Sequence, residues 1–255
     1  MSAKAPRKKI RWDLWMIVTV AISIFYLLFL LYPLISMLSK SVIGDDGGFT
    51  WKYFAKVFQK KYYQRAVLGS LKISATVTLI AVLLATPLAY IMSTIKIKFA
   101  SALQILILVS SMSAPFIGAY AWIMLCGRNG TITNFLLNTF GIKLGDIYGF
   151  KGCVIVMSLQ LYSLVFMFVS GAFKNMDNSL IEASESLGCS GIRKIFKVVL
   201  PLIMPTLLSG ALMVFMRTFA DYGTPMLIGE NYNTLPVVVY KEFLSEIGSS
   251  DGMAA

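Results

Sequence analysis

The segment from Asn175 to Gly188 has the residue types and spacing of a short capped helix. Ser179 and Glu182 stand three positions apart, as in a capping box, in which two side chains accept hydrogen bonds from free amides of the first turn. Gly188 follows where glycine commonly ends a helix. We expect a helix of about two turns over residues 179–187, too short to be stable alone in water. We therefore expect this helix to bind another surface, and a cytosolic protein is a natural partner.

This predicted helix has a charged side and an apolar side. Glu182 and Glu185 supply the charges. The apolar members are Leu180, Ile181, Ala183 and Leu187. Basic residues follow, and then a Leu-Pro pair: Arg193, Lys194, Lys197, Leu200 and Pro201. Without further context, these residues favour a plain capped loop helix with a basic anchor over a docking site.

Residues for catalysis or metal binding are scarce. The chain has no histidine, which removes the commonest metal ligand and general base. Cys126, Cys153 and Cys189 are far apart and form no paired motif. The sequence lacks the phosphate-binding pattern G-x-x-x-x-G-K-[ST], so we do not expect the chain to hydrolyse ATP. We expect no enzymatic activity, no cofactor and no metal site in this chain.

The composition indicates a membrane protein. Of 255 residues, 57% are hydrophobic and 14% charged, whereas about a quarter of a soluble domain is charged. The apolar residues form blocks of the roughly 20 residues that a spanning helix needs. The net charge of +11 lies between these blocks, which is typical of cytoplasmic loops and not of nucleic-acid binding. Five spans are predicted: 14–38, 67–93, 100–125, 153–173 and 202–219.

Orientation follows from the basic loops. The basic run from Lys4 to Arg11 places the N-terminus, residues 1–13, in the cytoplasm, and counting spans then places loop 174–197 there too. The same count puts segment 39–66 outside, although it is basic. Four apolar residues recur there at helical spacing, Trp51, Phe54, Val57 and Phe58, which predicts an amphipathic helix on the membrane surface.

The predicted spans contain a row of small residues and several prolines. Small residues recur every four positions at Ala81, Ala85, Ala89 and Ser93. Such a row lets another helix approach closely, although alanine is also common in membrane helices. Prolines that are expected to kink spans are Pro33, Pro87, Pro115 and Pro205.

The loop after the fourth span resembles the signature loop of ABC importer permeases. Its pattern is E-A-S at 182–184, three residues, Gly188, nine residues, Val198, one residue and L-P at 200–201. The family pattern is E-A-A, three, G, nine, I, one, L-P. Ser184 and Val198 depart from it conservatively, and the spacing is complete.

Two other stretches agree with this resemblance, which covers nearly the whole chain. Residues 129–137 resemble the family's outer loop after the third span. Residues 221–229, which begin Asp-Tyr-Gly-Thr-Pro, resemble, more weakly, the segment after the fifth span in the ferric-iron branch.

The resemblance implies an all-α membrane protein with the six-helix core of a type I ABC importer permease. Five helices are predicted here, with a truncation before a sixth that would begin near Asp251. The chain, 1–255, would be one permease domain, with 174–197 as cytoplasmic coupling loop and 220–255 as outer segment leading to the missing helix. It resembles the first half of a fused ferric-iron permease, so the second core would lie in the same or a homologous chain.

The resemblance also implies a function, in the multi-pass setting of the cytoplasmic membrane. An extracytoplasmic solute-binding protein would deliver the solute, here ferric iron, and a cytoplasmic ABC ATPase dimer would hold ATP and Mg²⁺. Contact with the ATPase would involve Ser179, Leu180, Glu182, Ala183, Leu187 and Gly188. Leu200 and Pro201 would start the fifth span at a fixed angle.

Arg217 and Asp221 stand four positions apart at the predicted outer end of the fifth span. They are candidates for an outer gate or for contact with the binding protein, although an ordinary interfacial ion pair is favoured.

Other functions stay open at this point. The same machinery would serve a polyamine, phosphonate, thiamine or sulfate. An ion-gradient carrier or channel usually places ionisable residues inside its spans, and the predicted span centres have none. A membrane scaffold would use the capped helix as an interaction site without transport. A membrane enzyme is the weakest alternative, because no nucleophile–base or metal constellation is evident.

Overall fold

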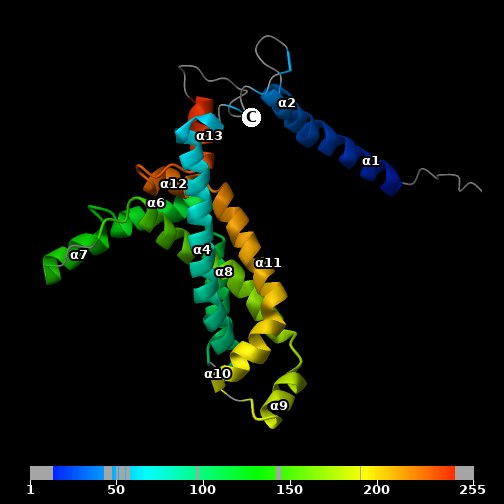
Figure 1. Ribbon diagram of the computed structural model, residues 1–255, viewed down its shortest axis with the longest axis vertical. Coiled ribbons are helices and arrows are strands. Elements are labelled where there is room, and N and C mark those ends of the chain that lie inside the picture. The colour runs from blue at the N-terminus through cyan, green and yellow to red at the C-terminus, as the bar shows by residue number, and fades with distance from the viewer. Residues whose placement is uncertain are drawn as a thin grey trace, which may run out of the picture. The chain divides into compact units, whose positions relative to one another are not determined.

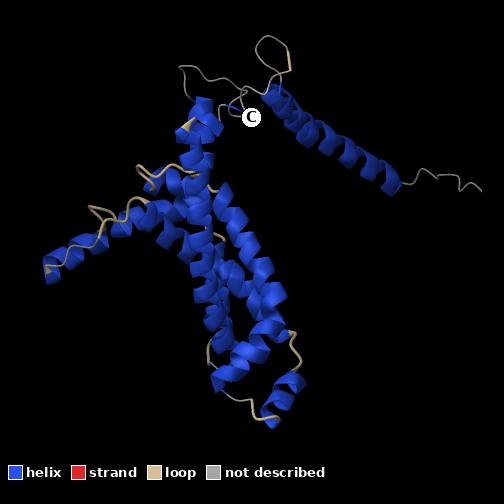
Figure 2. Cartoon of the chain, viewed as in Figure 1, coloured by secondary structure: helices blue, strands red, loops and turns tan. Residues whose placement is uncertain are grey.

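The computed structural model describes residues 14–42, 48–49, 51, 55, 58–95, 98–141, 145–189 and 191–244. Every regular element in these ranges is helical (Figures 1 and 2). The elements are α1 (Leu14–Tyr26), η1 (Leu27–Leu31), α2 (Tyr32–Val42), α4 (Lys61–Thr94), α5 (Ala100–Ser111), α6 (Pro115–Cys126), α7 (Thr131–Phe140), α8 (Phe150–Lys174), α9 (Asn178–Ser186), α10 (Gly191–Lys194), η2 (Ile195–Val199), α11 (Leu200–Ala220), α12 (Gly223–Ile228) and α13 (Leu235–Leu244). The chain divides into two units, residues 1–57 with 242–255, and residues 58–241.

In the first unit, α1, η1 and α2 follow one another without a break. Residues 14–36 are long and apolar enough to cross a membrane. None of the residues of α1 is buried, as expected for a helix whose apolar surface faces lipid. The basic run 4–11 and most of the predicted amphipathic segment 51–58 lie outside the described residues.

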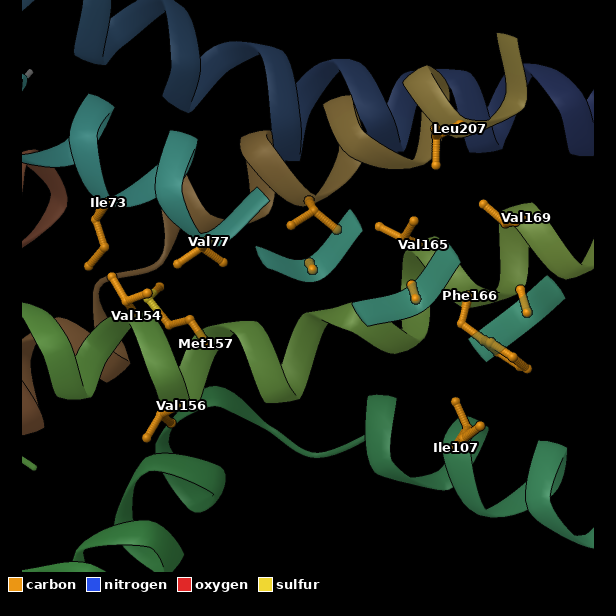
Figure 3. Packing of buried hydrophobic residues seen from close by; sticks show 14 of the residues in the cluster. Ile73, Val77, Ile107, Val154, Val156, Met157, Val165, Phe166, Val169 and Leu207 are labelled. Atoms are coloured by element: carbon orange, nitrogen blue, oxygen red, sulfur yellow. The ribbon is translucent and has the colours of Figure 1, made fainter. Parts of the chain in front are cut away.

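In the second unit, α4, α8 and α11 pack side by side and hold the core between them (Figures 1 and 3). Ala81, Ala85 and Ala89 are fully buried, so the row of small residues allows the close helix approach predicted for it. Ser93, the last member of that row, is exposed. The core residues labelled in Figure 3 include Ile73, Val77, Met157, Val165 and Leu207.

The third predicted span, 100–125, is not one straight helix, which corrects the sequence prediction. It is broken between Ser111 and Pro115, where the segments 100–111 and 115–140 meet at an angle of 102°. The cause is local: Ala114 has φ −65° and ψ 142°, because the residue before a proline is disfavoured in the α region. Four helices of the described residues could each span a membrane, and this bent pair would make a fifth span.

The fifth predicted span also differs from expectation. α11 begins at Leu200, with Pro201 in its first turn, but the helical run continues back through η2 and α10 to Gly191, well before the predicted start at residue 202. Just before Pro201, residues Ile195–Val199 form a π-helical turn, and another such turn, η1, precedes Pro33. A proline ring clashes with the carbonyl four residues earlier, and the wider π turn accommodates the ring without breaking the helix.

The segment after α11 is anchored on the α4–α8 bundle. Tyr232 Oη donates to the Gly69 carbonyl at 2.7 Å, and the Leu235 amide donates to Ser70 Oγ at 2.7 Å. It leads into α13, which is ten residues long and too short to span. The start of the predicted sixth helix, near 251, lies outside the described residues.

Candidate functional site

The predicted docking helix is α9, and its N-cap is Asp177, not Ser179. Asp177 Oδ1 accepts from the Ser179 amide at 2.9 Å. This hydrogen bond holds the pKa of the Asp177 carboxyl below its usual value, and the negative charge also suits the positive end of the helix dipole. The capping box between Ser179 and Glu182 therefore does not form. The Asp-Asn-Ser sequence carried this signal, because aspartate is among the preferred N-caps.

The C-terminal end of α9 is closed as predicted by Gly188. The Gly188 amide donates to the Glu185 carbonyl and the Cys189 amide to the Ser184 carbonyl, each at 2.9 Å. These two bonds make a Schellman motif, which requires a left-handed residue between them. Gly188 has φ +81°, a conformation that glycine adopts without steric cost.

The exposed surface of α9 contains most of the predicted docking residues. Glu182 and Ala183 are exposed, and Leu187 is 88% exposed. Leu180 is 47% exposed. In contrast, Ser184 is only 8% exposed, and its hydroxyl donates to the Ile181 carbonyl at 2.7 Å. The serine that replaces the second alanine of the family pattern is therefore buried with its hydroxyl satisfied, and it adds no polar group to the exposed surface of α9.

An ion pair ties α9 to the long helix that follows. Lys194 Nζ lies 2.5 Å from Glu185 Oε1, with the lysine side chain 18% and the glutamate 52% exposed. α9 also contacts α10 and η2. A displacement of α9 would therefore be carried to the start of the helix 191–220.

A hollow of about 560 Å³ lies beside this loop. Its walls come from the end of α8, the start of α11 and the turn between α8 and α9, and they include Phe168, Gly171, Met176, Asp177 and Leu202. The loop 175–177, which leads into α9, thus borders open space.

A second pocket, of about 440 Å³, opens where the broken span meets the end of α11. Its polar lining comprises Ser111, Ser113, Gln160, Arg217, Asp221 and Tyr222. Gln160 Nε2 donates to the Ser113 carbonyl at 3.1 Å. Non-helical backbone at membrane depth is tolerated where protein or a water-filled cavity satisfies it. Sequence reasoning missed Gln160, although it is the only amide side chain of the predicted fourth span.

Arg217 and Asp221 both line this pocket, but they form no ion pair with each other in the described residues. Asp221 Oδ1 accepts from the Gly223 amide at 2.8 Å, and its Oδ2 accepts from Thr224 Oγ1 at 2.8 Å. Asp221, the residue before the N-cap Tyr222, thus accepts hydrogen bonds from the first turn of α12. Burial raises the pKa of its carboxyl, and the hydrogen bonds from residues 223 and 224 partly oppose this.

A charged cluster joins three loops near α12. Arg128 Nη2 lies 2.9 Å from Asp146 Oδ2 and 2.8 Å from Glu230 Oε1. The Arg128 guanidinium also lies 4.8 Å from the centroid of the Tyr148 ring. Sequence reasoning missed this cluster, because its partners are up to 102 residues apart and no local pattern links them.

Comparison with known proteins places this architecture in a family. The family described as "Binding-protein-dependent transport system inner membrane component" matches residues 3–246. A putative ferric transport system permease protein, FbpB 1 of Haemophilus influenzae, is 25% identical over 83% of this chain and 34% of its own length. The chain thus spans about a third of that relative. The spermidine/putrescine transport system permease protein PotB of the same organism is 30% identical over 89% of this chain and 82% of its own length.

The fold is also found in a solved structure. The crystal structure of a bacterial alginate ABC transporter, in complex with an alginate pentasaccharide-bound periplasmic protein, contains a chain of similar fold. The similarity has a TM-score of 0.74 at 18% identity, over 94% of this chain and 86% of that one. With the family match over nearly the whole sequence, this shows that the chain belongs to the family of binding-protein-dependent transport system inner membrane components.

Proposed function

We propose that the chain is a membrane-spanning subunit of an ATP-driven importer and that α9 is its contact with a cytoplasmic ATPase dimer. The observation that carries this proposal is the helix itself. It is capped at both ends, it exposes Glu182, Ala183 and Leu187, and it contacts the rest of the chain through α10 and η2. A helix of nine residues is marginal alone, so a partner surface would stabilise it.

The mechanism is alternating access driven by the ATPase. ATP, with Mg²⁺, would bind the partner and close its two domains, and α9 would move with the groove that holds it. The Glu185–Lys194 ion pair would pass this movement to the helix 191–220. Such a lever works only if the docked ATPase has different affinities for the two states of the permease.

Ferric iron is the first candidate for the cargo, delivered by an extracytoplasmic binding protein. The support is the match of most of this chain to a part of a putative ferric transport permease. The match to a spermidine/putrescine permease keeps a polyamine as the second candidate. On the proposed orientation, the N-terminus and α9 face the cytoplasm, and α12 faces the other side.

The test is to purify the tagged chain from its native membrane and to identify what accompanies it. A Glu182→Lys, Gly188→Leu double variant reverses a charge on the exposed face and strains the C-cap. Its control is Lys151→Glu, a charge reversal of an exposed residue at the opposite end of α8.

We expect an ATPase subunit to accompany the unaltered chain and the control, and to be depleted from the double variant. An inserted, intact chain without any ATPase, or equal recovery in the double variant, would overturn the docking role. The carrier and scaffold alternatives would then take precedence.

A further inference from the structure

The pocket at the broken span is lined by one basic side chain, that of Arg217, which is exposed. Of its lining residues, Arg217 and Asp221 are the charged ones. Within the described part of the chain, Arg217 has neither a hydrogen bond nor an ion pair. It stands in the last turn of α11, three residues before the helix ends at Ala220.

The neighbouring carboxylate does not neutralise this cation by direct contact. Both oxygens of Asp221 are occupied by donors of α12, namely the amides of Gly223 and Thr224 and the Thr224 hydroxyl. These donors turn the carboxylate toward α12. The guanidinium therefore keeps its five N–H donors available to whatever enters the pocket.

The surroundings of Arg217 suit a small polar ligand. Ser111 and Ser113 lie at the break of the third span, and Gln160 faces them from α8. The volume of about 440 Å³ is within the range of small-molecule sites. The Ser111 and Ser113 hydroxyls donate to the carbonyls of Leu108 and Ala114, so the donors left for a ligand are the guanidinium and the second N–H of the Gln160 amide. A guanidinium binds an oxyanion through two parallel N–H donors.

We propose that this pocket is an oxyanion-binding subsite and that the imported solute presents a phosphate-, phosphonate-, sulfate- or carboxylate-like group to Arg217. This inference rests on the proposed import function and names the class of solute. A free polyamine carries only positive charge and would be repelled. Ferric iron would pass this point only within a complex that has an anionic outer face.

The experiment titrates inorganic phosphate into the full chain, purified with its accompanying subunits in lipid nanodiscs, at 0.15 M chloride. Equilibrium dialysis with labelled phosphate gives the Kd. The variants are Arg217→Gln, which removes the charge, and Arg217→Lys, which keeps it. The matched control is Lys151→Gln, an exposed cation outside the pocket. In Ala220→Glu, a carboxylate added to the pocket wall would compete for Arg217 without removing it.

We expect saturable phosphate binding by the unaltered chain, by Lys151→Gln and, somewhat more weakly, by Arg217→Lys. Binding should weaken about 10- to 100-fold in Arg217→Gln, the range for losing a charge-assisted hydrogen bond, and also in Ala220→Glu. Putrescine should not compete. Absence of saturable binding, or an unchanged Kd in both Arg217→Gln and Ala220→Glu, overturns the subsite.

The recovery of the ATPase from the same samples separates this inference from the proposed function. Arg217 is not part of α9, so its variants should retain the ATPase. If phosphate binds as expected but no ATPase is recovered with the unaltered chain, the importer proposal fails and the subsite stands. If the ATPase is recovered and phosphate does not bind, the subsite fails alone.

Discussion

Replacing Gly188 should loosen the C-terminal end of α9. Gly188 has φ +81°, and no atom outside its immediate neighbours lies within 4 Å of the position where a Cβ would be built. The cost of a side chain is therefore conformational and not a clash with neighbouring groups. A non-glycine residue in the left-handed region costs roughly 1–2 kcal/mol, asparagine less than others, and a β-branched residue most.

This cost sets the size of the effect. A free-energy change of 1–2 kcal/mol alters a population ratio by about 5- to 30-fold. We expect the ratio of closed to open Schellman motif to fall by that factor in Gly188→Ala. The fall should be smaller in Gly188→Asn and larger in Gly188→Val. The control is Gly171→Ala, because Gly171 lies within α8 and also has open space around its Cβ position.

The assay is amide hydrogen exchange in the full chain reconstituted in nanodiscs. The amides of residues 188 and 189 donate the two bonds of the motif, so their exchange reports its opening. We expect the exchange rate to increase from Gly188→Asn to Gly188→Ala to Gly188→Val. The Gly171→Ala variant should exchange at the rate of the unaltered chain. Equal exchange in Gly188→Val and the unaltered chain would refute the claim that the left-handed cap holds this end of α9.

Three further predictions concern the same framework. Asp177→Ala should speed exchange in the first turn of α9. Because the folded-state pKa of Asp177 is lowered, its stabilisation should be complete above about pH 4 and lost as the pH falls through the lowered value, and Asp177→Asn should remove this pH dependence. Lys194→Gln should reduce the free energy that keeps α9 packed against the start of the helix 191–220 by at most about 1 kcal/mol. The effect is small because the partner of Lys194, Glu185, is half exposed. Gly152→Ala should destabilise the bundle by about 1–3 kcal/mol or more, because its Cβ would lie 1.3 Å from a backbone carbonyl oxygen.

Each of these predictions has its own control. The Asp177 prediction fails if the Asn variant retains the acid-dependent opening. For the ion pair, the swap Glu185→Lys with Lys194→Glu should restore the packing of α9, and a swap no better than the single variant would contradict the pairing. For Gly152, the comparison is Gly145→Ala, which has open space at its Cβ. Equal thermal stability of the two alanine variants would argue against the close approach.

The spans were predictable because their signal is local. An apolar block of sufficient length must be helical in lipid, and α4 and α8 contain the residues expected for them. The break in the third span was less visible. Pro115 indicated a kink but not its size of 102°, and no local pattern shows that the Gln160 side chain, from α8, donates to the Ser113 carbonyl at the break.

The sequence predicted the ends of α9 more fully than the pocket around Arg217. Gly188 works as predicted, because a C-cap is decided by neighbouring residues. At the other end Asp177 is the N-cap in place of Ser179, because residues 177–179 are Asp, Asn and Ser, all three of them preferred N-caps. The pocket around Arg217 brings α5, α6, α8 and α11 together, and only their packing reveals it.

The most direct test of the central claim is cross-linking between α9 and the ATPase in the assembled importer. The native cysteines would be replaced and single cysteines placed at Ala183, Ser184 or Leu187. Positions 183 and 187 are exposed and position 184 is buried. We predict that cysteines at 183 and 187 are linked to the ATPase by a short thiol-reactive cross-linker and that a cysteine at 184 is not. Failure of both exposed positions to link, with the ATPase present, would contradict the claim that α9 is the docking helix.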